Sequence, residues 1–471
     1  MVNCEKFYNV LNNNGIDFFT GVPDSLLKSF CAYIADNAIS EKNIIAANEG
    51  SAVALAAGYH LATGKIGLVY MQNAGLGNAV NPLTSLNDKE VYSIPTLLLI
   101  GWRAEPGVKD EPQHTKMGKV TLEMLDTLGI PYKVLDDKFE DMIREAKRYM
   151  VQKNSPYAVV VKKDTFEKYD LEIKKENSYE LNREEAIKTV VSLLASDDIV
   201  VSTTGMISRE LFEIRERKKQ GHAKDFLTVG SMGHASSIAL AIALEKPSRQ
   251  VYCFDGDGAM IMHMGFLSVA GQLKPKNFKH IVFNNLAHDS VGGQPTAAVN
   301  VDMVEVARAN GYRNAFSVKT KKDLTDKTTK IKKMAGPILL EIKVSRGSRK
   351  DLGRPTTTPE ENKKLFMDFL GEKSSTSTAG ALKDFLIKNK AKNIFLTTGK
   401  ESFTLSGAEA ALAELLSSYK VTRFSDFGTN PDLKDLKKGV SMFKKGKYDA
   451  VVAIGGGSVI DMAKLINIFS V

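Results

Sequence analysis

The chain has 471 residues, a length that predicts roughly two to four domains. Of these residues 43% are hydrophobic and 25% charged, a balance typical of globular proteins. Its formal net charge is +9, but lysine and arginine are spread along the sequence without an arginine-rich arm, so nucleic-acid binding is not indicated. The positive charge fits either a solvated surface or one that attracts an anionic substrate. The most apolar run, residues 94–102, is far shorter than the roughly 20 residues that cross a bilayer, and the N-terminus has no secretory pattern. The three cysteines lack metal-ligand spacing and are expected to be reduced thiols of a cytoplasmic protein: Cys4, Cys31 and Cys253.

Short β-rich runs alternate with helical patterns, which predicts an α/β fold with parallel sheets covered by helices. The first unit is expected to have a short strand at FFT, before residue 21, and a helix over 51–63. Its other strands are expected at 43–47, 66–72, 96–101 and 157–162. The charged stretch 164–184 is expected to be a linker. The strands of a second unit are expected at 198–202, 225–229, 250–254, 280–284 and 338–344.

A second break lies at the basic, Pro/Gly-rich segment 345–358 and the Ser/Thr-rich segment 372–380. A third α/β pattern follows. Its strands are expected at 393–397, 420–424 and 450–454, with a helix near 407–418. With so few strands, this part is expected to have only a small core. Three domains are therefore predicted, at 1–170, 181–365 and 380–471.

The most informative segment is Gly256-Asp257-Gly258, which is followed, after the 25 residues 259–283, by Asn284-Asn285. Each element follows an apolar strand, and one helix of about 15 residues fits between them. Both elements are therefore expected at the same edge of a parallel sheet, where α/β proteins bind ligands. The glycines let backbone amides approach a phosphate, while Asp257 and Asn285 offer the oxygen ligands that Mg²⁺ prefers. The spacing predicts a site for a diphosphate and Mg²⁺.

This pattern resembles the cofactor motif of the thiamine-diphosphate-dependent enzymes. The resemblance implies that Mg²⁺ is held by Asp257, the Asn285 side chain and the main-chain carbonyl of Ala287. Leu286 stands where the family often has glycine or aspartate. The resemblance further implies that thiamine diphosphate is contacted by Thr204, Gly205, Ser231, Met232, Gly256, Asp257, Gly258, Ala259 and Asn285. Met232 would wedge between the two rings of the cofactor, whereas without the resemblance a methionine before a glycine is an ordinary core residue.

The resemblance extends to the first unit. Glu49, in Asn48-Glu49-Gly50 at the start of an Ala-rich helix, matches the family's glutamate, which hydrogen-bonds the aminopyrimidine and promotes the tautomer that deprotonates the thiazolium. Taken alone, it would be a helix-dipole partner. Asp24 resembles the family's active-site aspartate, and His114 the histidine with which the decarboxylases bind substrate or relay a proton. The plainer alternatives are a turn residue for Asp24 and a surface loop for His114.

Only the short charged stretch separates the first two units. This plan is similar to that of the phosphonopyruvate decarboxylases within the family, and next to that of the sulfopyruvate decarboxylases. The segments that carry the likeness lie within residues 1–365 and include GVPDSLL, DEPQHTKMG, SMGHASSIALAIAL and NNLAHDSVGGQPT. The resemblance implies decarboxylation of a small anionic 2-oxo acid: 3-phosphonopyruvate, giving phosphonoacetaldehyde and CO₂ in phosphonate biosynthesis, or alternatively sulfopyruvate. It also implies a homodimer or larger oligomer with active sites shared between subunits.

An anionic head group calls for cations that do not also hold the departing carboxylate. The candidates flank His114 or follow the last strand of the second unit: Lys109, Lys116, Arg349, Lys350 and Arg354.

In the third pattern, the sequence GGGSVID at 455–461 follows a strand and opens a helix, a place where backbone amides can hold a pyrophosphate. Together with FLTTGKESFTLSGA at 395–408, it resembles the nucleotide-binding half of the iron-dependent alcohol dehydrogenases. The metal-binding residues of that family come later in its chains, and no histidine follows His288 here, so dehydrogenase activity is not predicted. Two alternatives are open: a bifunctional decarboxylase–dehydrogenase, and a non-catalytic scaffold, which Glu49, Asp257 and Asn285 disfavour.

Overall fold

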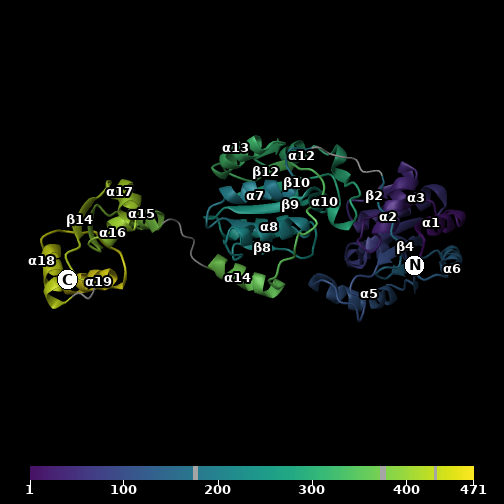
Figure 1. The fold of residues 1–471 in the computed structure, drawn as a ribbon, viewed down its shortest axis with the longest axis horizontal. Helices are drawn as coiled ribbons and strands as arrows, with labels where there is room; N and C mark the ends of the chain where they lie inside the picture. Colours follow the sequence, from purple (N-terminus) through teal and green to yellow (C-terminus); the bar gives the residue numbers. More distant parts are fainter. Residues whose placement is uncertain (173–178, 372–377, 429–431, 471) are drawn as a thin grey trace. The chain divides into compact units, whose positions relative to one another are not determined.

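The computed structural model describes residues 1–172, 179–371, 378–428 and 432–470, and Figure 1 shows its helices and strands. The chain forms two compact units, Met1–Gly371 and Glu372–Val471. From here on these are called the first and the second unit, and the first contains the residues of both units expected before residue 345. The first unit contains two six-stranded sheets, and the second contains a three-stranded sheet. Neighbouring strands are parallel in all three sheets of the described residues. The α/β class expected from the alternating pattern is confirmed.

The first sheet has the strand order β2-β1-β3-β4-β6-β5. Its strands are β1 (Phe19–Gly21), β2 (Asn43–Ile45), β3 (Gly67–Gln72), β4 (Thr96–Gly101), β5 (Tyr132–Val134) and β6 (Tyr157–Val161). The helices around it are α1 (Cys4–Asn13), α2 (Lys28–Asn37), α3 (Glu49–Thr63), α4 (Leu76–Pro82), α5 (Thr115–Thr127) and α6 (Phe139–Lys153). Leu97 and Leu99 of β4 pack into one hydrophobic cluster, whereas Leu98 and Ile100 pack into another. Because side chains alternate across a strand and both faces are covered, central strands of such a sheet are continuously apolar.

The second sheet has the order β11-β12-β10-β9-β7-β8. Its strands are β7 (Ile199–Ser202), β8 (Asp225–Leu227), β9 (Val251–Gly256), β10 (Phe278–Asn284), β11 (Asn314–Val318) and β12 (Ile338–Lys343). The helices are α7 (Arg183–Leu193), α8 (Met206–Arg217), α9 (Ala235–Glu245), α10 (Asp257–Met262), α11 (Phe266–Leu273), α12 (Met303–Ala309), α13 (Lys321–Lys332) and α14 (Pro359–Gly371). Read from the β8 edge, this sheet repeats the strand connectivity of the first. The two sheets repeat the same topology, although no repeat is visible in the sequence.

The expected strands form where the apolar runs lie, but two features differ. The sequence reading missed β5 and β11, which lie at sheet edges and are less apolar than the central strands. The expectation of a single helix between the glycine motif and Asn284-Asn285 is wrong. Two helices, α10 and α11, lie there, and residues 263–265 separate them. Of the two predicted linkers, residues 173–178 and 372–377 lie outside the described residues, and α7 begins within the first linker, at Arg183.

The second unit has a sheet with the order β14-β13-β15. Its elements are α15 (Thr378–Lys388), β13 (Asn393–Thr398), α16 (Ser402–Leu405), α17 (Ala408–Leu416), β14 (Lys420–Phe424), α18 (Leu433–Lys444), β15 (Ala450–Ile454) and α19 (Gly457–Ser470). Two small hydrophobic clusters form its core, one containing Leu396 and the other Phe395. As expected, the glycine triplet joins β15 to the start of α19.

Two further properties are the apolar character of the helices and the state of the cysteines. None of the described helices combines the length and the apolar character needed to cross a membrane. All three cysteines are free and buried. Burial raises the pKa of the Cys4 thiol to about 12, so this thiol is poorly reactive.

Candidate active site

The predicted metal ligand Asp257 lies at the carboxyl edge of the second sheet, as the first residue of α10. Its carboxylate accepts hydrogen bonds from the Thr296 hydroxyl and from the backbone N–H groups of Gly258 and Asn285. The side chain is only 3% exposed, and burial raises the pKa of its carboxyl to about 6. Among the described residues, no cationic side chain forms an ion pair with Asp257. A buried carboxylate without a counter-charge is costly, so the site suits a cation.

Asn285 and Ala287 follow β10, which is the parallel neighbour of β9, as expected from the sequence. The Asn285 Oδ1 atom accepts the Ala287 N–H at 3.1 Å. The turn between them requires a positive φ of 59° at Leu286, a conformation that glycine adopts at lower cost. In the described part of the chain, no donor reaches the Ala287 carbonyl. A carboxylate, an amide oxygen and a backbone carbonyl form a hard-oxygen donor set that fits Mg²⁺.

The predicted diphosphate contacts begin after β7. Gly205 precedes α8 with a φ of 96°, which only glycine adopts readily. The Thr204 hydroxyl donates to the Val229 carbonyl at 2.8 Å, which ties this turn to the one after β8. The neighbouring Thr203 hydroxyl is buried and has no partner within the residues described. An orphaned hydroxyl beside a helix N-terminus fits an anionic group such as a diphosphate, and Thr203 lies within the segment 202–205 that the sequence indicated for this contact.

Met232 lies in the turn after β8, and it belongs to none of the hydrophobic clusters of the described residues. It is partly exposed, whereas an ordinary core methionine would be buried. Ser231 has a φ of 51°. A Cβ on Gly233 would come within 2.9 Å of the Ala259 carbonyl, so this turn lies directly against α10. The position fits the predicted contact of Met232 with a group bound beside Gly256–Ala259.

Glu49 is the first residue of α3, and the Asn48 side chain caps this helix by accepting the Ser51 N–H at 2.9 Å. Glu49 is 6% exposed, unlike a simple helix-dipole partner at the surface. Its Oε2 atom accepts a hydrogen bond of 2.7 Å from Asn78 Nδ2. The carboxyl group also packs so closely on Gly75 that a Cβ there would come within 2.6 Å of Glu49 Oε1.

The Asn48 side chain also donates to the Met262 carbonyl at 3.3 Å. Within the first unit, the start of α3 therefore meets the end of α10, the helix that begins at Asp257.

Asp24 lies beyond the end of β1 and is fully buried, so it is not a solvated turn residue. Its carboxylate accepts hydrogen bonds from Gln72 Nε2 at 2.8 Å and from the Leu26 N–H at 3.0 Å. A Cβ on Gly101 would come within 2.1 Å of Asp24 Oδ1. Burial raises the pKa of this carboxyl group, although both hydrogen bonds oppose the rise. The ends of β1, β3 and β4 thus enclose one carboxyl group.

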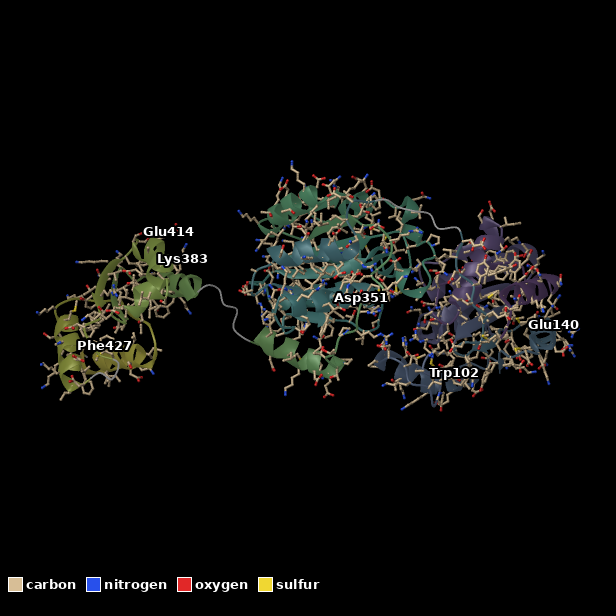
Figure 2. All side chains as sticks on the ribbon, viewed as in Figure 1. Trp102, Glu140, Asp351, Lys383, Glu414 and Phe427 are labelled. Atoms are coloured by element: carbon tan, nitrogen blue, oxygen red, sulfur yellow. The ribbon has the colours of Figure 1, made fainter. Side chains whose placement is uncertain are left out.

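His114 is 8% exposed, and burial, reinforced by the charge of Arg103, lowers its pKa to about 4. The imidazole is therefore neutral near pH 7, and its Nδ1 atom has no partner in the described structure. Trp102, labelled in Figure 2, anchors α5 by donating from its indole nitrogen to the Gly118 carbonyl at 2.8 Å. Since α5 begins directly after His114, this contact fixes the histidine at the carboxyl edge of the sheet.

Arg103 is a residue of this edge that the sequence reading did not select. It follows β4, and its Nε atom donates to Asp110 at 2.7 Å while Nη1 donates to Ser25 Oγ at 2.7 Å. It therefore links the Asp24 turn to the loop that carries His114. Its position after the buried run TLLLIG was the available signal, because such strand ends line ligand sites.

The five cations predicted for the substrate head group differ in their surroundings. Lys109, Lys116 and Lys350 are exposed. Arg354 pairs with Glu111, on the loop before His114. Arg349 forms ion pairs with three carboxylates, those of Glu184, Glu213 and Asp351, which already balance its charge. The structure thus brings Arg354 to the His114 loop, which carries Lys109 and is followed by Lys116, whereas Arg349 joins α7 to α8.

Family models match both parts of the first unit. The thiamine pyrophosphate enzyme N-terminal TPP binding domain matches residues 4–126, and the corresponding C-terminal TPP binding domain matches residues 203–342. The iron-containing alcohol dehydrogenase model matches residues 374–471. These matches and the arrangement of the site define the class as a thiamine pyrophosphate enzyme.

Individual proteins with similar sequences show which family of thiamine pyrophosphate enzymes the chain resembles. A phosphonopyruvate decarboxylase of Streptomyces viridochromogenes is 32% identical over 378 residues, which cover 76% of this chain and 93% of that protein. One from Streptomyces hygroscopicus is 33% identical over 403 residues, covering 81% and 97%. A sulfopyruvate decarboxylase of Methanosarcina acetivorans is 28% identical over 399 residues, covering 78% and 98%. The chain belongs to the phosphonopyruvate decarboxylase family of thiamine pyrophosphate enzymes, so the resemblance drawn from the motifs is confirmed.

Proposed function

We propose that this protein decarboxylates 3-phosphonopyruvate to phosphonoacetaldehyde and CO₂ with thiamine diphosphate and Mg²⁺, as a step of phosphonate biosynthesis. The observation that carries the proposal is the pair of buried acids, Glu49 and Asp257, one in each matched thiamine pyrophosphate domain. The two relatives named as phosphonopyruvate decarboxylases match over nearly their whole length. The buried, free thiols are in keeping with a reducing, cytoplasmic location.

In this proposal the second sheet holds the cofactor. Asp257, Asn285 Oδ1 and the Ala287 carbonyl would bind Mg²⁺, and the turns after β7 and β8 and the start of α10 would contact the diphosphate. Met232 would lie against the two rings of thiamine diphosphate. When bound, thiamine diphosphate supplies the nucleophilic carbon and the electron sink that decarboxylation requires.

The first sheet supplies proton chemistry. Glu49 would hydrogen-bond to the ring nitrogen of the aminopyrimidine, and Asn78 holds the Glu49 side chain in place through its hydrogen bond to Oε2. His114 is neutral and can accept or donate a hydrogen bond at the substrate, while the buried Asp24 carboxyl group lies at the same sheet edge. After CO₂ leaves, a proton takes its place on the substrate carbon, and these side chains are the candidates that deliver it.

The head group of the substrate is proposed to be bound by cations near the His114 loop. Lys109 and Lys116 lie on either side of His114, are exposed and have no ion pair among the described residues, so they are the stronger candidates of the five. Arg354 can exchange Glu111 for a phosphonate. Lys350 and Arg349 follow β12, and Arg349 would first have to leave its carboxylate partners.

We expect the purified full-length protein, supplied with thiamine diphosphate and Mg²⁺, to release CO₂ from 3-phosphonopyruvate at least about tenfold more efficiently, in kcat/KM, than from sulfopyruvate or pyruvate. Phosphonate carries more negative charge than sulfonate, so a basic pocket favours it. Higher efficiency with sulfopyruvate would establish the alternative substrate. NADH oxidation upon addition of phosphonoacetaldehyde would instead support a bifunctional protein that uses the second unit.

The protein is further proposed to act as a homodimer or larger oligomer, with sites shared between subunits. Apolar side chains exposed on α3, α9 and α11 support an interface there: Leu55, Leu61, Leu244 and Val269. A closed twofold dimer would bury such faces on both chains.

Mixing Glu49→Gln and Asp257→Ala chains, each inactive alone, tests the shared site. Random pairing should restore up to about a quarter of the wild-type sites, because half of the dimers are mixed and half of their sites contain both wild-type residues. Recovered decarboxylation after verified subunit exchange is the measurement. If each chain completes its own site, as the Asn48–Met262 contact permits, no activity returns.

A further inference from the structure

The orientation of the Asn285 amide is fixed by two neighbours. Its Nδ2 atom donates to Asp289 Oδ2 at 2.6 Å, and its Oδ1 atom accepts the Ala287 N–H at 3.1 Å. A carboxylate can only accept and a backbone N–H can only donate, so both contacts demand the same orientation. With the amide flipped, N–H donors would replace the oxygen on the side of the proposed cation.

Asp289 is itself held by a buried charge network. The same Oδ2 atom accepts Arg183 Nη1 at 2.9 Å and the Gly347 N–H at 3.0 Å. Arg183 also donates two hydrogen bonds of 2.9 Å to Glu210, and both side chains of this pair are at most 5% exposed. Arg183 begins α7 and Glu210 lies on α8, so two helices fix the position of the Asp289 carboxylate.

We propose that Asp289 is a positioning residue of the metal site, which holds Asn285 so that Oδ1, and not Nδ2, faces the cation. The proposal rests on the proposed function, because it assumes that a divalent cation binds between Asp257 and Asn285. Partners that orient metal ligands typically change metal affinity by about 10- to 100-fold.

The test is the Mg²⁺ affinity of the full-length protein at saturating thiamine diphosphate, measured by calorimetric titration. Asp289→Ala should weaken Mg²⁺ binding at least about tenfold, since the Asn285 amide then loses the shorter of the two contacts that set its orientation. Asp289→Asn should stay within about threefold of the wild type, because its amide oxygen can accept from the same three donors. Retained affinity in this conservative variant separates orientation of Asn285 from the charge of Asp289.

Asp225→Asn is the matched control for the loss of a buried ion pair. Asp225 is fully buried and pairs with Arg215 through hydrogen bonds of 2.7 and 2.9 Å, but it has no contact with residues 285–289 among its hydrogen bonds. This variant should lower the melting temperature and leave the Mg²⁺ affinity within about threefold. An equal loss of affinity in Asp225→Asn and Asp289→Ala would overturn the positioning role, as would an equal loss in Asp289→Asn.

The wild type distinguishes failure of the proposed function from failure of the proposed role of Asp289. If it shows no Mg²⁺-dependent binding of thiamine diphosphate, the proposed function fails and the role of Asp289 fails with it. If the wild type binds and Asp289→Ala binds equally well, only the role of Asp289 is refuted. Should Asp289→Ala not fold, Asp289→Glu keeps the charge but moves the carboxylate by one methylene. The same tenfold weakening is then expected, and unchanged affinity would overturn the proposal.

Discussion

Glu49→Gln is expected to lower the decarboxylation rate by about 10²- to 10⁴-fold while thiamine diphosphate affinity changes only a few-fold. The glutamine keeps the shape of the buried side chain and its hydrogen bond with Asn78, but an amide cannot transfer the proton that the aminopyrimidine requires. The direct measurement is exchange of the thiazolium C2 proton for deuterium in the cofactor-loaded protein. Wild-type exchange rates in the variant would remove Glu49 from the mechanism.

Glu140→Gln provides the control for the simpler helix-dipole role of Glu49. Glu140, labelled in Figure 2, lies in the first turn of α6 and is exposed. Both substitutions remove a negative charge near a helix N-terminus, which is typically worth about 0.3–1 kcal/mol. Only Glu49→Gln should affect deuterium exchange, so a similar effect of both variants would point to the helix dipole instead.

Asp257→Ala is expected to weaken Mg²⁺-dependent retention of thiamine diphosphate by more than about 100-fold. Loss of a residue that only orients a metal ligand typically costs about 10- to 100-fold in affinity, and loss of a ligand itself should cost more. The diphosphate would then meet an incompletely coordinated cation. The measurement is thiamine diphosphate affinity at saturating Mg²⁺. Asp198→Ala is the control, because Asp198 is also a buried acid of this sheet but lies at the opposite end, before β7. If Asp257→Ala retains the cofactor as well as Asp198→Ala does, the metal assignment is wrong.

The cofactor-free protein offers a second readout for Asp257. Its carboxyl has a pKa of about 6 in the folded chain, above the ordinary value of 3.8, so folding favours the protonated form. The stability that this group contributes is present below about pH 4 and is lost as the pH rises through about 6. We therefore expect Asp257→Ala to gain in melting temperature relative to the wild type as the pH rises from about 4 to about 6, when Mg²⁺ is absent. A constant difference over this range would show that Asp257 does not titrate there.

The sequence by itself determined the fold class, and it predicted which residues hold the proposed cofactor. The central strands of both six-stranded sheets are long apolar runs because helices cover both faces, and such runs are readable without a structure. Gly256-Asp257-Gly258 and Asn284-Asn285 follow two of these runs, so their meeting at one sheet edge follows from parallel pairing of β9 and β10. The edge strands β5 and β11 were not predicted, because each pairs on one side only and carries a weaker apolar signal.

Only the tertiary structure decided which side chains support the proposed catalytic and metal-binding residues. Asn78 reaches Glu49 across 29 positions and Thr296 reaches Asp257 across 39, and no local pattern encodes such contacts. Asp289 lies only four residues after Asn285, but its proposed role depends on Arg183, which holds its carboxylate in place and is far away in the sequence. Motifs specify the groups that bear the chemistry, since few residue types can perform it. Their partners need only a suitable donor or acceptor at the right point in space, and the packing of helices and sheets alone determines where that point lies.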